Sequence, residues 1–95
     1  QSAVAHMPCL VCELTGWGPS QSELHHPLTP GNRRRHRDCV IPLCPTHHRL
    51  GVNTQMAVSR HPWRREFERR YGSDDYLWSI VRQRLVAAGL RPPDV

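Results

Sequence analysis

The chain of 95 residues contains no lysine, no hydrophobic run long enough to cross a membrane, and no internal repeat or low-complexity segment. Because a transmembrane helix needs about 20 mainly apolar residues, we do not expect a membrane-spanning protein, and no signal peptide is visible. The length allows one domain, and the core of a domain this small is thin. Such domains often depend on a bound metal or on disulfides for their stability.

Since lysine is absent, all 13 basic residues are arginine, and the formal net charge is +5 with a pI of about 9.7. Arginine makes bidentate contacts with phosphate, and a basic balance suits nucleic acid. Exclusive use of arginine also occurs in proteins from GC-rich genomes. The prediction of nucleic-acid binding therefore rests on the positive charge and not on the choice of arginine over lysine. Four arginines crowd one predicted loop, where they either clamp DNA phosphates or form a solvated tip: Arg33, Arg34, Arg35 and Arg37.

The four cysteines could form two disulfides, but their spacing relative to histidine favours a metal site and a reducing compartment. Cys9 and Cys12 form a C-x-x-C pair, and Cys44 and His47 form a C-x-x-H pair. Two such knuckles present four ligands of the kind that a tetrahedral structural zinc ion takes. An all-cysteine alternative replaces His47 with Cys39. We prefer His47 because its pair repeats the knuckle spacing, whereas Cys39 falls within a predicted strand and is expected to be a small buried hydrophobic residue.

Three further histidines lie close to this frame in the sequence: His25, His26 and His48. Adjacent residues on a strand point to opposite sides, so His25 and His26 cannot both bind one metal comfortably. One can bind a metal while the other activates water, which is the division of labour that phosphodiester hydrolysis needs. A neutral imidazole suits the second role because its pKa lies near neutral pH. The alternative is a solvated histidine pair on a strand.

The predicted fold is a small, zinc-stabilised α+β domain in the order zinc knuckle, β-hairpin, short helix and two C-terminal helices. Its elements are a strand over 22–26, a polar loop over 27–38, a return strand over 39–43, a short helix that starts at Pro45 and ends near Gly51, a helix over 62–71, and a helix that is capped by Ser73 or Asp74 and closed by Gly89. Helical spacing predicts that Trp63, Phe67 and Tyr71 pack in the core. Trp17, in a Gly-Pro loop, is expected to cover the zinc knuckle.

The histidine pairs also complete a pattern that resembles a known nuclease family. Glu-Leu-His-His at 23–26, a loop, the return strand ending in Val-Ile-Pro-Leu-Cys, and His-His at 47–48 are similar to an HNH endonuclease of the ββα-metal fold, also called the His-Me finger. The resemblance implies that His25 and His48 hold a catalytic divalent metal ion and that His26 is the general base.

The C-terminal part is similar to the phage Ref-type RecA-dependent nuclease family. This resemblance is carried by His-His-Arg at 47–49, by His61 and by Phe-Glu-Arg-Arg-Tyr-Gly at 67–72, and with the HNH part it covers about residues 9–78. It implies that His61 completes the catalytic metal site; the alternative is a surface histidine at the start of a helix. Residues 1–7 are typical of a cloning remnant, and residues 8–95 are expected to form the single HNH nuclease domain.

Together these resemblances imply a metal-dependent DNA endonuclease of phage or prophage origin that is associated with recombination. Zinc is the expected structural ion and Mg²⁺ the expected catalytic one, although imidazole ligands also suit Mn²⁺, Ni²⁺ and Zn²⁺. DNA is the expected partner, with a RecA-type recombinase filament as a second one, and we expect a monomer in the cytoplasm of a bacterial host. Two alternatives are a catalytically inactive zinc module that binds DNA or a recombinase filament, and a zinc-dependent protein-interaction domain.

Overall fold

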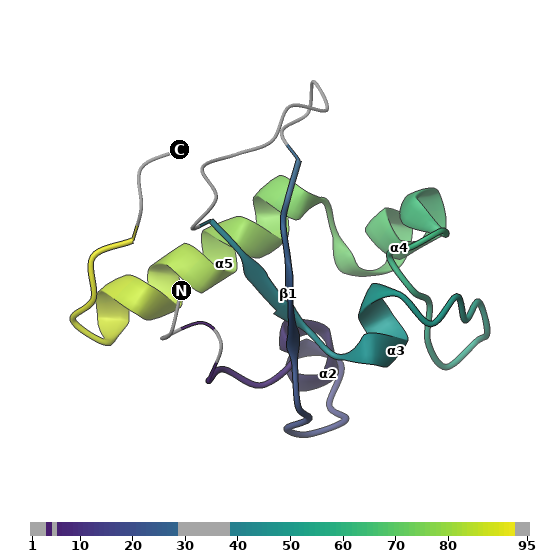
Figure 1. Cartoon of the computed structure of the whole chain (residues 1–95), viewed down its shortest axis with the longest axis horizontal. Coiled ribbons are helices and arrows are strands. Elements are labelled where there is room, and N and C mark those ends of the chain that lie inside the picture. The colour runs from purple at the N-terminus through teal and green to yellow at the C-terminus, as the bar shows by residue number, and fades with distance from the viewer. Residues whose placement is uncertain (1–3, 5, 29–38, 93–95) are drawn as a thin grey trace.

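The computed structural model describes residues 4, 6–28 and 39–92, which form a two-stranded antiparallel sheet with helices around it (Figure 1). In chain order, the elements are helix α2 (Leu10–Leu14), strands β1 (Glu23–His25) and β2 (Ile41–Leu43), and helices α3 (Pro45–His48), α4 (Arg64–Tyr71) and α5 (Asp74–Ala87). The predicted α+β class and the order of hairpin, short helix and two C-terminal helices are confirmed. Most of the predicted polar loop lies outside the described residues, and so do its arginines, Arg33, Arg34, Arg35 and Arg37.

The sheet is a hairpin whose strands pair in the register Glu23 opposite Leu43, Leu24 opposite Pro42, and His25 opposite Ile41. Both strands are shorter than the predicted ranges of 22–26 and 39–43. Pro27 lacks a backbone N–H and so limits any extension of the strand beyond His26. Strand β2 is buried along its whole length, whereas β1 is buried only at His25. The end of β1 therefore directs a histidine into the protein.

Strand β2 is the centre of the packing. Helices α2, α3 and α5 all contact it, and Figure 1 shows α3 and α4 on one side of the hairpin and the C-terminal end of α5 on the other. Fully buried side chains from α2, β2, α4, α5 and the segment before α4 form one cluster: Leu10, Val11, Ile41, Leu43, Val58, Phe67, Leu77 and Val81. Because this core is small, a bound metal ion can contribute a large share of the stability.

Two of the helix ends are set by residues whose local conformational preferences are well known, Ser73 and Gly72. The Ser73 side chain accepts a hydrogen bond of 3.1 Å from the backbone N–H of Tyr76 and so begins α5. Gly72 ends α4 with a φ of +108°, and a Cβ atom at this position would collide with the ring of Tyr76. Helix α2 was not predicted. It begins after Cys9, whose sulfur accepts a hydrogen bond of 3.4 Å from the backbone N–H of Cys12.

The prediction that Trp63 packs in the core is wrong. Helix α4 begins at Arg64, so Trp63 precedes the helix; it is 43% exposed, and its indole N–H donates to the Gly51 carbonyl at 2.9 Å. Phe67 is fully buried and Tyr71 packs partly buried against the core, as helical spacing predicts. Among the helices of the described ranges, none combines the length and the apolar character that a membrane span requires.

Candidate metal centres

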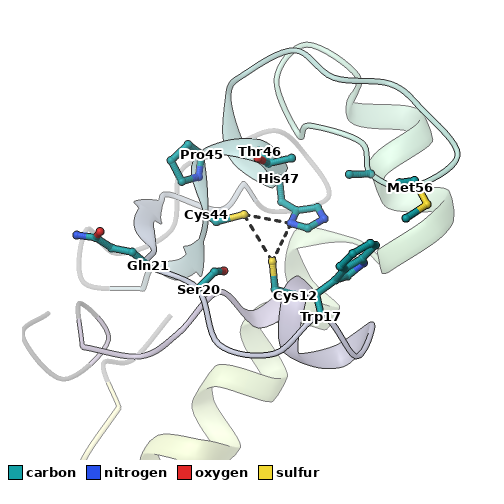
Figure 2. A pocket seen from close by; sticks show the side chains of 10 residues that line it. Cys12, Trp17, Ser20, Gln21, Cys44, Pro45, Thr46, His47 and Met56 are labelled. Atoms are coloured by element: carbon teal, nitrogen blue, oxygen red, sulfur yellow. Dashed lines mark hydrogen bonds between the residues drawn. The ribbon is translucent and has the colours of Figure 1, made fainter.

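Cys9, Cys12, Cys44 and His47 come together where helices α2 and α3 begin. Cys9 and Cys44 immediately precede the two helices, while Cys12 and His47 lie within them, so each helix start contributes two possible ligands. The His47 Nδ1 atom lies 3.4 Å from the Cys12 sulfur, 3.3 Å from that of Cys44 and 3.8 Å from that of Cys9. Figure 2 shows the Cys12 and Cys44 sulfurs turned toward the His47 ring. All four side chains are buried.

The spacing within this Cys3His group fits a tetrahedral zinc ion. With Zn–S bonds of about 2.3 Å and a Zn–N bond of about 2.1 Å, tetrahedral geometry places two sulfurs about 3.8 Å apart and a sulfur and a nitrogen about 3.6 Å apart. The observed distances lie close to these values. The Cys12 and Cys44 sulfurs are 3.6 Å apart, well beyond the bond of about 2.05 Å in a disulfide. The group could therefore hold a metal ion such as zinc.

The Cys3His group is buried, and the His47 ring turns Nδ1 toward the three sulfurs. Burial raises the pKa of the Cys9 thiol to about 12, so a nearby cation is needed to keep it as a thiolate at neutral pH. The His47 Nε2 atom, on the far side of the ring, is buried and has no hydrogen-bond partner among the described residues. The same ring meets Tyr71 edge-on, with ring centroids 5.4 Å apart.

Cys39, the alternative zinc ligand, is fully buried in the hydrophobic cluster and does not belong to the Cys3His group. This position agrees with its expected role as a small core residue. Trp17 lines the same pocket as Cys12 and His47 (Figure 2), but 57% of its surface is exposed. The expectation that Trp17 covers the knuckle is therefore corrected, because the side chain flanks the pocket beside the group and stays largely exposed.

A second group of possible ligands consists of His25, His48 and His61, which each offer a ring nitrogen within 4.8 Å of the others. The ring centroids are 5.4 Å apart for His25 and His48, 5.7 Å for His25 and His61, and 5.5 Å for His48 and His61. His25 ends β1, His48 ends α3, and His61 lies between α3 and α4. The structure thus brings together the three histidines that the sequence predicts as ligands of a catalytic metal.

Backbone hydrogen bonds explain how His61 reaches this group although a long segment separates it from His48. The segment after α3 folds back on itself and is closed by an isolated β-bridge. The N–H of Arg60 then donates to the carbonyl of His47 at 2.8 Å, and the N–H of His61 donates to the carbonyl of His48 at 3.0 Å. These two bonds fix His61 directly beside the end of α3.

Carboxylates contact one ring nitrogen of two of these histidines. His48 Nδ1 lies 2.9 Å from Glu23 Oε1, and His25 Nε2 lies 3.2 Å from Asp74 Oδ1. The other ring nitrogens, Nε2 of His48 and Nδ1 of His25, are the ones that a metal ion could use. Burial lowers the pKa of both His25 and His61, although the hydrogen bond to Asp74 opposes this effect at His25. Neutral imidazole, the form that binds metals, is therefore favoured.

Asp74 is held from several sides. Arg60 donates to Oδ1 through Nε at 3.2 Å and to Oδ2 through Nη2 at 3.1 Å, and the backbone N–H of Leu28 donates to Oδ2 at 2.8 Å. Burial acts to raise the pKa of Asp74, but hydrogen bonds from His25, Arg60 and Leu28 outweigh burial and hold the pKa well below its ordinary value. Sequence reasoning missed Arg60, whose one available signal is its position next to His61, and considered Asp74 only as a helix cap.

His26 lies on the same pocket as the three-histidine group. The pocket has a volume of about 350 Å³ and is lined by Leu24, His25, His26, Leu28, His48, Arg60 and His61. His25 is buried and His26 is exposed, as expected for neighbouring residues at a strand. The pocket therefore combines three possible metal ligands with an imidazole that water can reach.

The fold and these two groups define a small α+β protein with two candidate metal centres, to each of which helix α3 contributes one histidine. A family model described as recombination enhancement, RecA-dependent nuclease matches residues 1–86, and the chain belongs to this family. The resemblance to the Ref-type family is thereby confirmed, and the family name implies nuclease activity linked to recombination. No curated protein and no solved structure matches the chain at a significant level.

Proposed function

We propose that the protein is a metal-dependent DNA endonuclease of the HNH type that acts in recombination. The observation that carries the proposal is the convergence of His25, His48 and His61 on one pocket that also contains the exposed His26. Membership of the RecA-dependent nuclease family supports phosphodiester hydrolysis as the reaction and a RecA-type filament as a partner.

In this proposal His25, His48 and His61 hold a divalent ion, which when bound would stabilise the negative charge that develops on the phosphate. His26 takes a proton from the attacking water, and its exposed position leaves the ring accessible to both water and the DNA backbone. Glu23 holds the His48 ring in place through its hydrogen bond. The all-imidazole ligand set suits Mn²⁺, Ni²⁺ and Zn²⁺ as well as Mg²⁺.

The Cys3His group is proposed as a structural zinc site. Its ligands connect the start of α2 to the start of α3, and His48 directly follows the ligand His47. Four protein ligands complete a tetrahedral zinc site and leave no open position for a substrate, which is the arrangement of structural zinc.

DNA binding is proposed to depend on the loop arginines Arg33, Arg34, Arg35 and Arg37. Three of the four arginines of α4 are weaker candidates because acidic neighbours partly neutralise them. Arg64 pairs with Glu68, and Arg69 and Arg70 both pair with Glu66.

The function is tested by His26→Ala, with His6→Ala as a matched control, because His6 is an exposed histidine that lines a different pocket. Zinc-loaded proteins are incubated with plasmid duplex or single-stranded DNA, with Mg²⁺ or Mn²⁺, in the presence and absence of RecA filaments. We expect His26→Ala to lose about two to four orders of magnitude in cleavage rate. Zinc content and DNA affinity should stay unchanged, and His6→Ala should behave as wild type.

Two results would contradict the proposal in different ways. If His26→Ala cleaves as fast as wild type with every metal tested, His26 is not the general base and the HNH mechanism is wrong for this chain. If the wild-type protein binds DNA but cleaves no substrate under any condition, the catalytically inactive zinc module becomes the better explanation.

A further inference from the structure

Arg60, Asp74 and His25 form a buried hydrogen-bonded group at the histidine pocket, which Arg60 and His25 line. Their exposed fractions are 3%, 1% and 3%. Removing a carboxylate and a guanidinium from water is costly unless hydrogen bonds of good geometry replace the lost hydration. Burial of this pair is therefore weak evidence for a stabilising role, and its contact with the pocket residue His25 points to a role at the pocket.

Both oxygens of the Asp74 carboxylate are occupied by donors. Oδ1 lies within hydrogen-bond distance of His25 Nε2 and accepts from Arg60 Nε, while Oδ2 accepts from Arg60 Nη2 and from the Leu28 N–H. An ionised carboxylate can only accept hydrogen bonds, so the ring nitrogen that faces it must carry the proton. His25 is thereby placed in the Nε2–H tautomer, and Nδ1 is its remaining nitrogen with a free lone pair.

We propose that Asp74, clamped by Arg60, is a positioning residue that fixes the tautomer and orientation of His25 so that Nδ1 is available to the metal. The inference rests on the proposed function, because it requires a metal ion at His25, His48 and His61. Histidine ligands of metals commonly donate their second N–H to a carboxylate, which orients the ring and raises the basicity of the ligating nitrogen.

Glu23 makes the corresponding contact with His48 in a more exposed environment. Its side chain is 29% exposed, and it also pairs with Arg49, which is 57% exposed. Water screens such pairs, so they hold a ring less firmly than buried ones. Asp74 is accordingly expected to have the larger effect on metal binding.

A purely structural role is the alternative for Asp74. Asp74 is the first residue of α5, and its bond to the Leu28 N–H links this helix to the segment after β1. A structural role predicts lower stability of an Asp74 variant, with unchanged metal affinity of the molecules that fold. A positioning role predicts a loss of metal affinity in the folded variant and a single tautomer of His25 in the wild type.

The first measurement compares Mn²⁺ binding by zinc-loaded wild type, Asp74→Asn and Glu66→Gln, using the electron paramagnetic resonance signal of free Mn²⁺. Glu66→Gln is the matched control, because Glu66 is also a carboxylate held by arginines, Arg69 and Arg70, but none of its described hydrogen bonds involves a pocket histidine, whereas Asp74 contacts His25. We expect Mn²⁺ affinity to fall about 10- to 100-fold in Asp74→Asn and to stay unchanged in Glu66→Gln.

The possible results separate this inference from the proposed function. Wild-type Mn²⁺ affinity in a folded Asp74→Asn protein overturns the positioning role and leaves the metal site intact. Absence of Mn²⁺ binding by the zinc-loaded wild type overturns the metal site itself, and with it the proposed function.

The second measurement needs no folded Asp74 variant. Two-bond ¹H–¹⁵N correlation spectra of ¹⁵N-labelled, zinc-loaded wild-type protein show which nitrogen of each neutral histidine carries the proton, and the His25 signals are assigned by their loss in His25→Asn. We expect a single Nε2–H tautomer for His25. A proton on Nδ1, or fast exchange between the two tautomers, overturns the proposal whatever the variants do.

Discussion

Replacing Cys12 with serine is expected to unfold the protein, because the Cys3His group joins two helices that cannot be stable alone. Helix α2 has 5 residues and α3 has 4. Both are far below the length of about 12–15 residues at which isolated helices become marginally stable in water. In the proposed zinc site, the four ligands would fix the start of each helix against the other, so a bound zinc ion would replace the stability that neither helix has on its own.

The size of the effect follows from the length of the chain. At roughly 0.05–0.15 kcal/mol per residue, a domain of 95 residues has a free energy of unfolding of about 5–14 kcal/mol. A structural zinc ion contributes an apparent binding free energy of about 10–16 kcal/mol at neutral pH. Loss of the proposed zinc ion would therefore remove as much free energy as the whole fold possesses, and Cys12→Ser removes one of the three thiolates that would hold the ion.

Elemental analysis and urea unfolding followed by circular dichroism measure the two consequences. We expect about one zinc per chain in the wild type, and little zinc and no cooperative transition in Cys12→Ser. Cys39→Ala is the matched control, because Cys39 is also fully buried but lies outside the ligand group. It should keep its zinc and lose only about 1 kcal/mol. A Cys12→Ser protein that contains no zinc and still unfolds cooperatively would refute the structural role.

His61→Ala should weaken Mn²⁺ binding as much as His48→Ala does, measured by electron paramagnetic resonance; wild-type affinity would show that His61 is not a ligand. Replacing Arg33, Arg34 and Arg35 together with alanine should flatten the salt dependence of DNA affinity without changing sequence preference, measured by fluorescence anisotropy, whereas an unchanged slope would place the DNA contact elsewhere. Phe67→Ala should cost about 3–5 kcal/mol in urea unfolding because Phe67 is fully buried. Leu50→Ala, at a residue that is 57% exposed, should stay within about 0.5 kcal/mol of wild type; equal losses would contradict the packing.

Features that depend on neighbouring residues were predictable from the sequence. The C-x-x-C and C-x-x-H pairs each place two ligands within one turn, and Ser73 and Gly72 act on the backbone within a few residues. The prediction for Trp63 failed because it depended on the residue at which helix α4 begins. A helix that begins one residue after Trp63 leaves its side chain outside the buried face, and boundaries of this kind are the least certain part of a helical pattern.

The Asp74 network could not be predicted, because its members are far apart in the sequence. His25 and Asp74 are 49 positions apart, and Arg60 and Asp74 are 14 positions apart. Their contact depends on how the start of α5 packs against the end of the hairpin, which periodicity does not encode. Asp74 also occupies an ordinary position for an acidic residue, the first turn of a helix. Because this position alone accounts for an aspartate, the sequence gives no sign of its buried contacts.

Helix α3 connects the two candidate centres, and we expect the three-histidine group to depend on metal binding at the Cys3His group. Consecutive helical residues point about 100° apart, so His47 can face the Cys3His group while His48 faces the three-histidine group. The carbonyls of the same two residues accept the hydrogen bonds that fix Arg60 and His61. Zinc at the Cys3His group would thus position His48 and His61 together, through a helix too short to hold itself. Loss of zinc should therefore abolish Mn²⁺ binding at the three-histidine group.

The reverse dependence is not expected. His25 is positioned by β1 and Asp74, and none of the Cys3His ligands contacts it through the described hydrogen bonds. His25→Ala should therefore lose Mn²⁺ affinity and keep about one zinc per chain, measured on the same sample by elemental analysis and Mn²⁺ titration. Simultaneous loss of both metals in a folded His25→Ala protein would show that the two centres form one unit. Zinc binding at the Cys3His group would then not be independent of the three-histidine group.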